Sequence, residues 1–381
     1  MLTYPELVRL ERAIRDERVL SVYIHGAAED PAARLAWHTE LDRSLRDLRR
    51  WLLGSEHEER EAFERCVATL GELLTPFAAG LPSPGWAGFI VDGVVHDAEQ
   101  LPVPMPTMAI WSTGMCVAPY IRALEVTRPM IVAVLDSRVA RIYRYHIGTL
   151  DELQTIHAHA NIDAPAHMGD TPRVGFHPGV HGETRHDAAR RARTAGTERL
   201  LREVEDVVTK LAASDEGIII GGASRVTARF RRALAKTVAD RVLPLESLRA
   251  DATRAEIAAA ASQGASALRD ARYLRQVAEL VAGDGDMTTL GPSATRFALE
   301  HQAVRELYLT PRFLEDHMAE AEEAVRQALD QGAHVEQWSR DAAATLDQHG
   351  GLGARLRFRV PAASADLRAL VPNAEGTSEA T

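Results

Sequence analysis

Residues 217–222, Gly-Ile-Ile-Ile-Gly-Gly, constrain the fold more than any other stretch of this sequence. Three consecutive isoleucines leave the run without a polar face, and two glycines close it. A short apolar run of this kind is typical of a buried strand in a parallel sheet. A helical pattern follows at 224–239, so the strand is predicted to end at a helix N-terminus. The sequence therefore predicts an α/β protein.

The turn after this run is a place to look for an anion site, because helix N-termini attract negative charge. Gly221-Gly222-Ala223-Ser224 lacks the lysine of a phosphate-binding loop, however, and does not match a dinucleotide-binding fingerprint. We therefore expect a tight strand-to-helix turn with Ser224 as the helix N-cap.

Strand and helix patterns predict three domains and a tail, at residues 1–128, 129–283, 284–360 and 361–381. In the first domain, apolar or alternating runs predict strands at 19–24 and 88–93. Four tryptophans of this domain fit its core better than a base-stacking platform: Trp37, Trp51, Trp86 and Trp111. The third domain alternates helix and strand, as a compact three-layer α/β domain does. The tail is polar and is expected to be disordered.

The central domain mixes β-rich and helical segments. Residues 131–145 are two β-rich runs joined at Asp136-Ser137-Arg138, which predicts a hairpin although the turn lacks glycine. Residues 184–213 predict a long basic helix, and a second long helix is predicted before residue 283. We therefore expect a mixed sheet with helices packed against it.

The chain as a whole is acidic, with a formal net charge of -10. This charge excludes a generally basic nucleic-acid coat but is compatible with a local basic patch. The two cysteines, Cys66 and Cys116, are too few for a disulfide framework or a zinc site and fit a reducing cytoplasm. No apolar run approaches the roughly 18 residues that span a bilayer. We expect a cytoplasmic protein with no membrane partner.

Positive charge is concentrated in residues 179–196, GVHGETRHDAARRARTAG. Four arginines lie within nine residues of it, and the only acid among residues 184–197 is Asp187. One interpretation is an RNA-binding helix made by Arg185, Arg190, Arg191 and Arg193. The alternative is a solvated helix face on which Arg190 and Arg193 pair with Glu198, Glu203 or Glu205.

Histidines gather in the same region: His157, His159, His167, His177, His181 and His186. Asp163, Asp170 and Glu183 lie among them, and imidazole with carboxylate can hold zinc or another transition metal. Polar loops also collect histidines that bind nothing, and no helical His-x-x-x-His pair is present here. We therefore assign neither a metal nor a cofactor.

Three stretches, taken in order, resemble the bacterial branch of the archaeo-eukaryotic peptide chain release factor and Pelota superfamily. VAVLDSRVARIYRY at 132–145 is similar to the opening hairpin of that family's central domain, and GIIIGGASRVTARF at 217–230 to its later strand and helix. GGLGARLRFRV at 350–360 is similar to the closing strand of the family's C-terminal domain. The resemblance implies three α/β domains, with a mixed-sheet central domain and a C-terminal α/β sandwich like those of ribosomal proteins.

In release factors, a Gly-Gly-Gln loop followed by a basic helix positions a water molecule against the ester of peptidyl-tRNA. The matching place here is His181-Gly182-Glu183. The resemblance therefore implies catalytic positions at Gly182 and Glu183, and rRNA contacts from Arg185, Arg190, Arg191 and Arg193. Histidine in place of glycine restricts the backbone, and glutamate in place of glutamine repels phosphates. Hydrolysis is left open, with Glu183 as a candidate general base.

Together these features predict a ribosome-associated translation factor that acts at the A site, in rescue, hibernation or a release-like reaction. The expected partners are the ribosome and rRNA, with peptidyl-tRNA and an elongation-type GTPase as further candidates. The first domain lacks codon-reading motifs, which argues against stop-codon decoding. The alternative is a non-ribosomal metal-binding or stress-related binding protein on the same scaffold.

Overall fold

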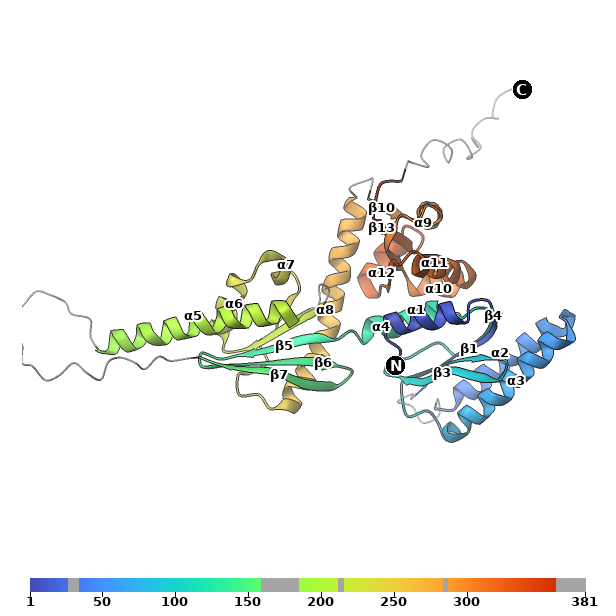
Figure 1. The fold of residues 1–381 in the computed structure, drawn as a ribbon, viewed down its shortest axis with the longest axis horizontal. Coiled ribbons are helices and arrows are strands. Elements are labelled where there is room, and N and C mark those ends of the chain that lie inside the picture. The colour runs from blue at the N-terminus through green and yellow to red at the C-terminus, as the bar shows by residue number, and fades with distance from the viewer. Residues whose placement is uncertain (27–33, 159–184, 212–215, 284–286, 361–381) are drawn as a thin grey trace, which may run out of the picture. The chain divides into compact units, whose positions relative to one another are not determined.

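The computed structural model describes residues 1–26, 34–158, 185–211, 216–283 and 287–360. The chain divides into two compact units (Figure 1). Residues 1–127 and 273–381 form what we call the terminal unit, and residues 128–272 form the central unit. Each unit is built from sheets with helices packed on them, which confirms the predicted α/β class. Of the helices that the structure describes, none combines the length and apolar character required to cross a membrane.

The N-terminal segment of the terminal unit is an antiparallel sheet in the order β3-β2-β1-β4. Its strands are β1 (Arg18–His25), β2 (Gly85–Val91), β3 (Val94–Leu101) and β4 (Met108–Thr113). Alternation along β1 sorts side chains between two cores. Leu20, Val22 and Ile24 face α2 (Ala36–Trp51) and α3 (His57–Leu74). Val19 and Tyr23 face α1 (Tyr4–Ala13) and α4 (Ala118–Val126).

One predicted core residue of this segment is exposed. Trp37, Trp86 and Trp111 are buried, as expected, whereas Trp51 is 61% exposed. The buried stripe of α2 runs through Trp37, Leu41 and Leu45, and its spacing places Leu52 in the core. Trp51 lies beside that stripe and therefore projects into solvent.

The C-terminal segment of the terminal unit is a sheet in the order β10-β13-β11-β12, in which only β11 and β12 are parallel. Its strands are β10 (Thr288–Leu290), β11 (Val304–Leu309), β12 (His334–Gln337) and β13 (Leu352–Leu356). One face packs on α9 (Pro292–Glu300), α10 (Pro311–Asp316) and α11 (Met318–Asp330), in a core shared with α1 and α4. The other face packs on α12 (Arg340–Asp347) and the end of α8 (Arg254–Ala282).

The predicted three-domain division stays a prediction. Each of the three predicted segments holds one sheet, and the first and third share a hydrophobic core. The shared core is the physical reason why these two segments form one compact unit.

The central unit is a mixed sheet in the order β7-β6-β5-β8-β9. Its strands are β5 (Met130–Leu135), β6 (Val139–His146), β7 (Thr149–His157), β8 (Gly217–Gly222) and β9 (Val242–Pro244). The predicted hairpin is the antiparallel pair β5–β6, and the predicted parallel strand is β8, which pairs with β5. One face packs on α5 (Arg185–Leu211), α6 (Ser224–Ala233) and α7 (Lys236–Ala239), and the other on the first part of α8.

The turn after β8 differs from its prediction in two details. Ala223, with an extended backbone, is the N-cap of α6, and Ser224 is the first helical residue. Gly222 adopts a φ of 114° and turns the chain so sharply that the cap falls one residue earlier. The predicted helix at 224–239 is also divided, because Leu234 is extended where its side chain enters the core.

Candidate nucleic-acid interface

The structure describes the predicted arginine helix but not the predicted loop before it. His181, Gly182 and Glu183 lie outside the described residues, which resume with α5 at Arg185. The side chain of Arg185 also lies outside the description. The RNA-binding prediction can therefore be followed at Arg190, Arg191 and Arg193.

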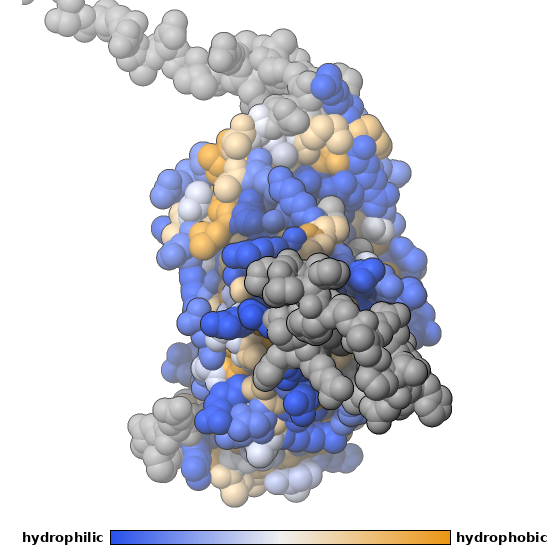
Figure 2. Space-filling view, turned by 90° about the vertical axis from the view of Figure 1, so that its left-hand side faces the viewer, coloured by the Kyte–Doolittle hydropathy of each residue, from blue (hydrophilic) through white to orange (hydrophobic). Residues whose placement is uncertain are grey.

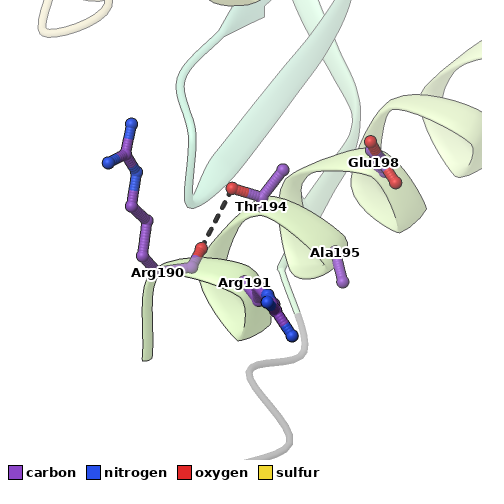
Figure 3. Close-up of a pocket in the computed structure, with 5 residues that line it drawn as sticks. All are labelled: Arg190, Arg191, Thr194, Ala195 and Glu198. Atoms are coloured by element: carbon purple, nitrogen blue, oxygen red, sulfur yellow. Dashed lines mark hydrogen bonds between the residues drawn. The ribbon is translucent and has the colours of Figure 1, made fainter. Parts of the chain in front are cut away.

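All three of these arginines are exposed near the N-terminal end of α5, and Figure 3 shows Arg190 and Arg191. The local sequence explains this exposure, because residues 187–195 hold no large apolar side chain. The buried stripe of α5 begins later, at Leu200, Leu201, Val204 and Val208. The early turns of the helix therefore present charge, while its later turns anchor it to the sheet.

An open hollow on α5 is lined by Arg190, Arg191, Thr194, Ala195 and Glu198 (Figure 3). The Thr194 hydroxyl donates a hydrogen bond of 3.0 Å to the carbonyl oxygen of Arg190 and is satisfied within the helix. One turn later, the Thr197 hydroxyl donates to the carbonyl oxygen of Ser137 at 3.1 Å. Since Ser137 lies in the β5–β6 turn, this bond ties the arginine-bearing part of α5 to the sheet.

The acid in this hollow is paired with a neighbouring helix. Glu198 accepts a hydrogen bond from the guanidinium of Arg229, which belongs to α6. The sequence had suggested Glu198 as a partner for Arg190 or Arg193 within α5. The ion pair between Glu198 and Arg229 joins α5 to α6 and brings the arginines of α6 beside those of α5.

Helix α6 carries a set of basic residues that the sequence interpretation missed. Arg225, Arg229 and Arg232 follow at i, i+4 and i+7, which places them on one face of the helix. The signal was present in the sequence, because residues 217–239 contain no acid. We call the exposed arginines of both helices the α5–α6 arginine surface: Arg190, Arg191, Arg193, Arg199, Arg202, Arg225, Arg229, Arg231 and Arg232.

The charge of this surface is uneven along α5. Glu203 and Asp206 are exposed in the later turns, so the positive charge is densest toward Arg190. Figure 2 views the protein from the side on which α5 begins, and the described residues there are predominantly hydrophilic. The geometry suits a polyanion that approaches the first turns of α5.

The histidine-rich region gives no described metal site. His157 is exposed at the end of β7, the side chain of His186 is outside the description, and so are residues 159–184. Among the residues that the structure describes, the group able to hold a metal ion is Glu125, His334 and Glu336. No sequence motif linked these three residues, since they come from distant parts of the chain.

The central unit combines a hairpin, a parallel strand and an arginine-bearing helix on one mixed sheet. Residues 116–266 match the family model described as bacterial archaeo-eukaryotic release factor family 10. The match covers less than half of the chain and confirms the resemblance for this segment. The matched segment includes α5, α6 and the residues between β7 and α5. Because release factors act in translation, this match indicates that the protein is a translation factor.

Several solved structures are similar to the chain at low identity. Archaeoglobus fulgidus Pelota is 15% identical, with a TM-score of 0.36, over 73% of this chain and 80% of that chain. Saccharomyces cerevisiae Dom34 is described as a translation termination-like factor that interacts with Hbs1. It is 14% identical, with a TM-score of 0.38, over 61% of this chain and 64% of that chain. An archaeal Pelota in a ribosome-bound model with ABCE1 is 14% identical, with a TM-score of 0.42, over 94% of this chain and 95% of that chain. No curated protein matches the sequence.

Proposed function

We propose that this protein is a ribosome-associated translation factor that binds rRNA through the α5–α6 arginine surface and acts at the A site. The observation that carries the proposal is the set of exposed arginines on two adjoining helices of the segment that matches the release-factor family. The proposed partners are the ribosome and rRNA, with peptidyl-tRNA at the reaction site and an elongation-type GTPase for delivery.

Charge supports a localised contact with RNA. Guanidinium groups donate paired hydrogen bonds to phosphate oxygens, and their binding releases counterions from the nucleic acid. The chain as a whole carries a net charge of -10, so its attraction for phosphate is local and not general. A local concentration of positive charge orients the protein as it binds.

The reaction depends on the residues that precede α5. In the sequence, Gly182 and Glu183 are separated by one residue, Thr184, from the helix that carries the arginines. In the proposed complex, contacts between α5 and rRNA bring this segment to the peptidyl-tRNA ester. The outcome is rescue, hibernation or a release-like hydrolysis, depending on whether Glu183 activates water.

Co-sedimentation with 70S ribosomes at low salt tests the binding. A variant with Arg190→Glu, Arg191→Glu and Arg193→Glu is expected to lose ribosome binding, because three attractions become repulsions. A matched control reverses Arg43, Arg46 and Arg50, which are exposed on α2. Binding by the α5 variant at the level of this control would contradict the proposal.

A peptide-release assay on ribosomes with loaded P-site tRNA tests the reaction. If Glu183 is the general base, Glu183→Ala is expected to reduce hydrolysis by about 100-fold or more without loss of co-sedimentation. If wild-type protein binds but releases no peptide above a ribosome-only control, the role is rescue or hibernation without hydrolysis. The two assays therefore separate binding from chemistry.

A further inference from the structure

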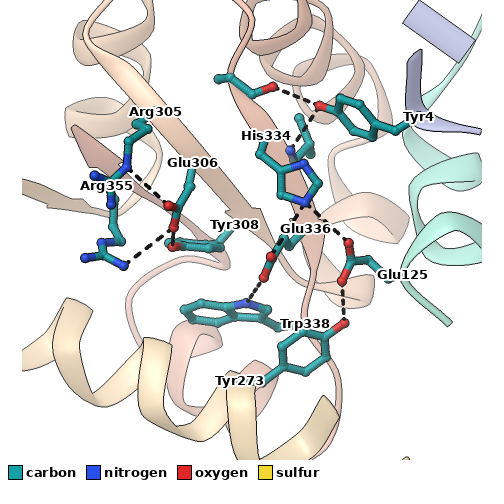
Figure 4. Close-up of polar contacts among 12 residues, drawn as sticks. Tyr4, Glu125, Tyr273, Arg305, Glu306, Tyr308, His334, Glu336, Trp338 and Arg355 are labelled. Atoms are coloured by element: carbon teal, nitrogen blue, oxygen red, sulfur yellow. Dashed lines mark hydrogen bonds and ion pairs between the residues drawn. The ribbon is translucent and has the colours of Figure 1, made fainter. Parts of the chain in front are cut away.

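Three side chains of the terminal unit form a cluster that RNA binding does not use. Glu125, His334 and Glu336 each bring one ligand atom to a common centre, with all three atoms within 4.8 Å of one another (Figure 4). We propose that these residues bind a divalent transition-metal ion of the zinc type.

The fold brings the three ligands together from two elements. His334 and Glu336 are two residues apart on β12, so their side chains lie on the same face of the strand. Glu125 lies near the end of α4, which packs beside β12. The residues of both carboxylates are almost fully buried, at 4% and 3% exposure for Glu125 and Glu336. A pair of buried carboxylates beside an imidazole is a compact set of metal donors.

The distances leave room for an ion between the donors. His334 Nε2 lies 3.7 Å from Glu125 Oε1 and 3.7 Å from Glu336 Oε1. These separations exceed a normal hydrogen bond. An ion held about 2.1 Å from each donor in a tetrahedral site separates the donors by about 3.4 Å. Side-chain shifts of a few tenths of an ångström would therefore close the site around the ion.

Each carboxylate is held by a neighbour through its other oxygen (Figure 4). The hydroxyl of Tyr273 donates to Glu125 Oε2 at 3.2 Å. The indole Nε1 of Trp338 donates to Glu336 Oε2 at 3.4 Å. In both cases Oε1 remains directed at His334. Metal-binding carboxylates in proteins are commonly oriented by hydrogen bonds of this kind.

His334 is also held in place but stays accessible. Its ring packs on the ring of Tyr4, with the centroids 4.9 Å apart. The Tyr4 hydroxyl donates to the carbonyl oxygen of Ala333 and accepts from the amide of Val335, which fixes the backbone on both sides of the histidine. The side chain of His334 is 34% exposed. This opening provides an entry path and space for a water molecule as a fourth ligand.

The donor set selects the class of ion. Magnesium and calcium prefer oxygen donors alone, whereas zinc accepts imidazole and carboxylate together. A bound ion would join α4 to β12 and thus link the two segments that share the core of the terminal unit. Because such a site forms only in the folded chain, binding would stabilise that unit.

Zinc titration of tag-free, metal-depleted protein, in competition with a chelating dye, tests the site. We expect one zinc per chain and a higher thermal unfolding temperature. His334→Gln and Glu125→Gln are each expected to weaken binding by at least about 100-fold, and Tyr273→Phe by about 10-fold. Glu306→Gln, a change at a carboxylate that is bonded to Tyr308 outside the cluster, is the matched control and should bind like the wild type.

Three results would overturn the proposal. They are the absence of stoichiometric zinc, full binding by His334→Gln, and loss of binding on His157→Ala instead. If His334→Gln and Glu125→Gln do not fold, Tyr273→Phe decides the matter, since it removes one hydroxyl from a ring that stays buried. Unchanged zinc affinity in that variant would count against the site.

Discussion

Glu198 of α5 is ion-paired with Arg229 of α6, so one acid lies within a surface of arginines. Both side chains are nearly half exposed, at 46% and 45%. An ion pair with this exposure contributes only about 0 to 1 kcal/mol to stability. Its larger effect is on charge, because it neutralises one arginine of the α5–α6 arginine surface.

Removal of this acid is expected to strengthen RNA binding. In Glu198→Gln, Arg229 is no longer neutralised, and affinity for ribosomes at low salt should rise several-fold. The thermal unfolding temperature should change by no more than a few degrees. Ribosome co-sedimentation across a protein titration measures the first effect, and a melting curve measures the second. Weaker binding would show that the pair orders the surface for RNA.

The arginines of α6 are expected to contact RNA together with those of α5. Arg225→Glu combined with Arg232→Glu should lower ribosome affinity and flatten its salt dependence. Each lost phosphate contact reduces the slope of log affinity against log salt by about 0.7 to 0.9. The same two reversals at Arg43 and Arg46 of α2 serve as the control. An unchanged slope in the α6 variant would restrict the RNA contact to α5.

Asp97 on β3 makes the stability of the terminal unit depend on pH. Burial raises the pKa of Asp97 from 3.8 to about 6, and the carboxylate of Glu99 adds to the rise. The folded state therefore binds this proton more tightly than the unfolded state. Its stabilising contribution is full below about pH 4 and is lost as the pH rises through about 6.

Asp97→Asn is expected to remove this loss. At about pH 7.5 the variant should raise the free energy of unfolding by on the order of 1 kcal/mol, a figure reduced for the partial exposure of the side chain. At about pH 4 the gain should vanish, because the native carboxyl is already neutral in the folded state. Urea unfolding at the two pH values measures the difference. An equal gain at both would show that the effect is not one of ionisation.

Gly222, at the end of β8, is expected to tolerate no side chain. Its φ is 114°, and a Cβ atom there would lie 1.9 Å from the carbonyl oxygen of Leu135. Gly222→Ala should therefore cost several kcal/mol of stability in the central unit. Gly148→Ala is the matched control, since φ is 77° there but nothing lies within 4 Å of the added carbon. It should cost about 1 to 2 kcal/mol, and equal melting temperatures for the two variants would refute the steric argument.

Local sequence patterns predicted the elements that have strong local signals. The isoleucine run predicted a strand at 217–222, where the structure has β8. The basic pattern predicted a helix at 184–213, where the structure has α5. Strands β3 and β4 were among those not predicted, because their pairing depends on β2 and β1 more than on their own composition. Tertiary packing also decided the break at Leu234, where a helical pattern continues in the sequence.

The candidate sites, too, were predictable only where their residues are neighbours in the sequence. Arg190, Arg191 and Arg193 could be predicted because they are neighbours in one helix. The contribution of α6 became visible only through the contact between Arg229 and Glu198, which lie on separate helices. The cluster of Glu125 with His334 and Glu336 joins residues more than 200 positions apart, and no local pattern reports such a pairing.

The shared core of the terminal unit has a consequence for how the protein is made. Residues 1–127 are translated before residues 273–356, but α1 and α4 pack on partners that begin at residue 273. The central unit is continuous in sequence and can fold while those partners are still being synthesised. The terminal unit can complete its fold only after β13, the last strand of its second sheet, has been translated. A factor proposed to act on ribosomes thus relies on a ribosome that has translated β13 before the larger of its two units can form.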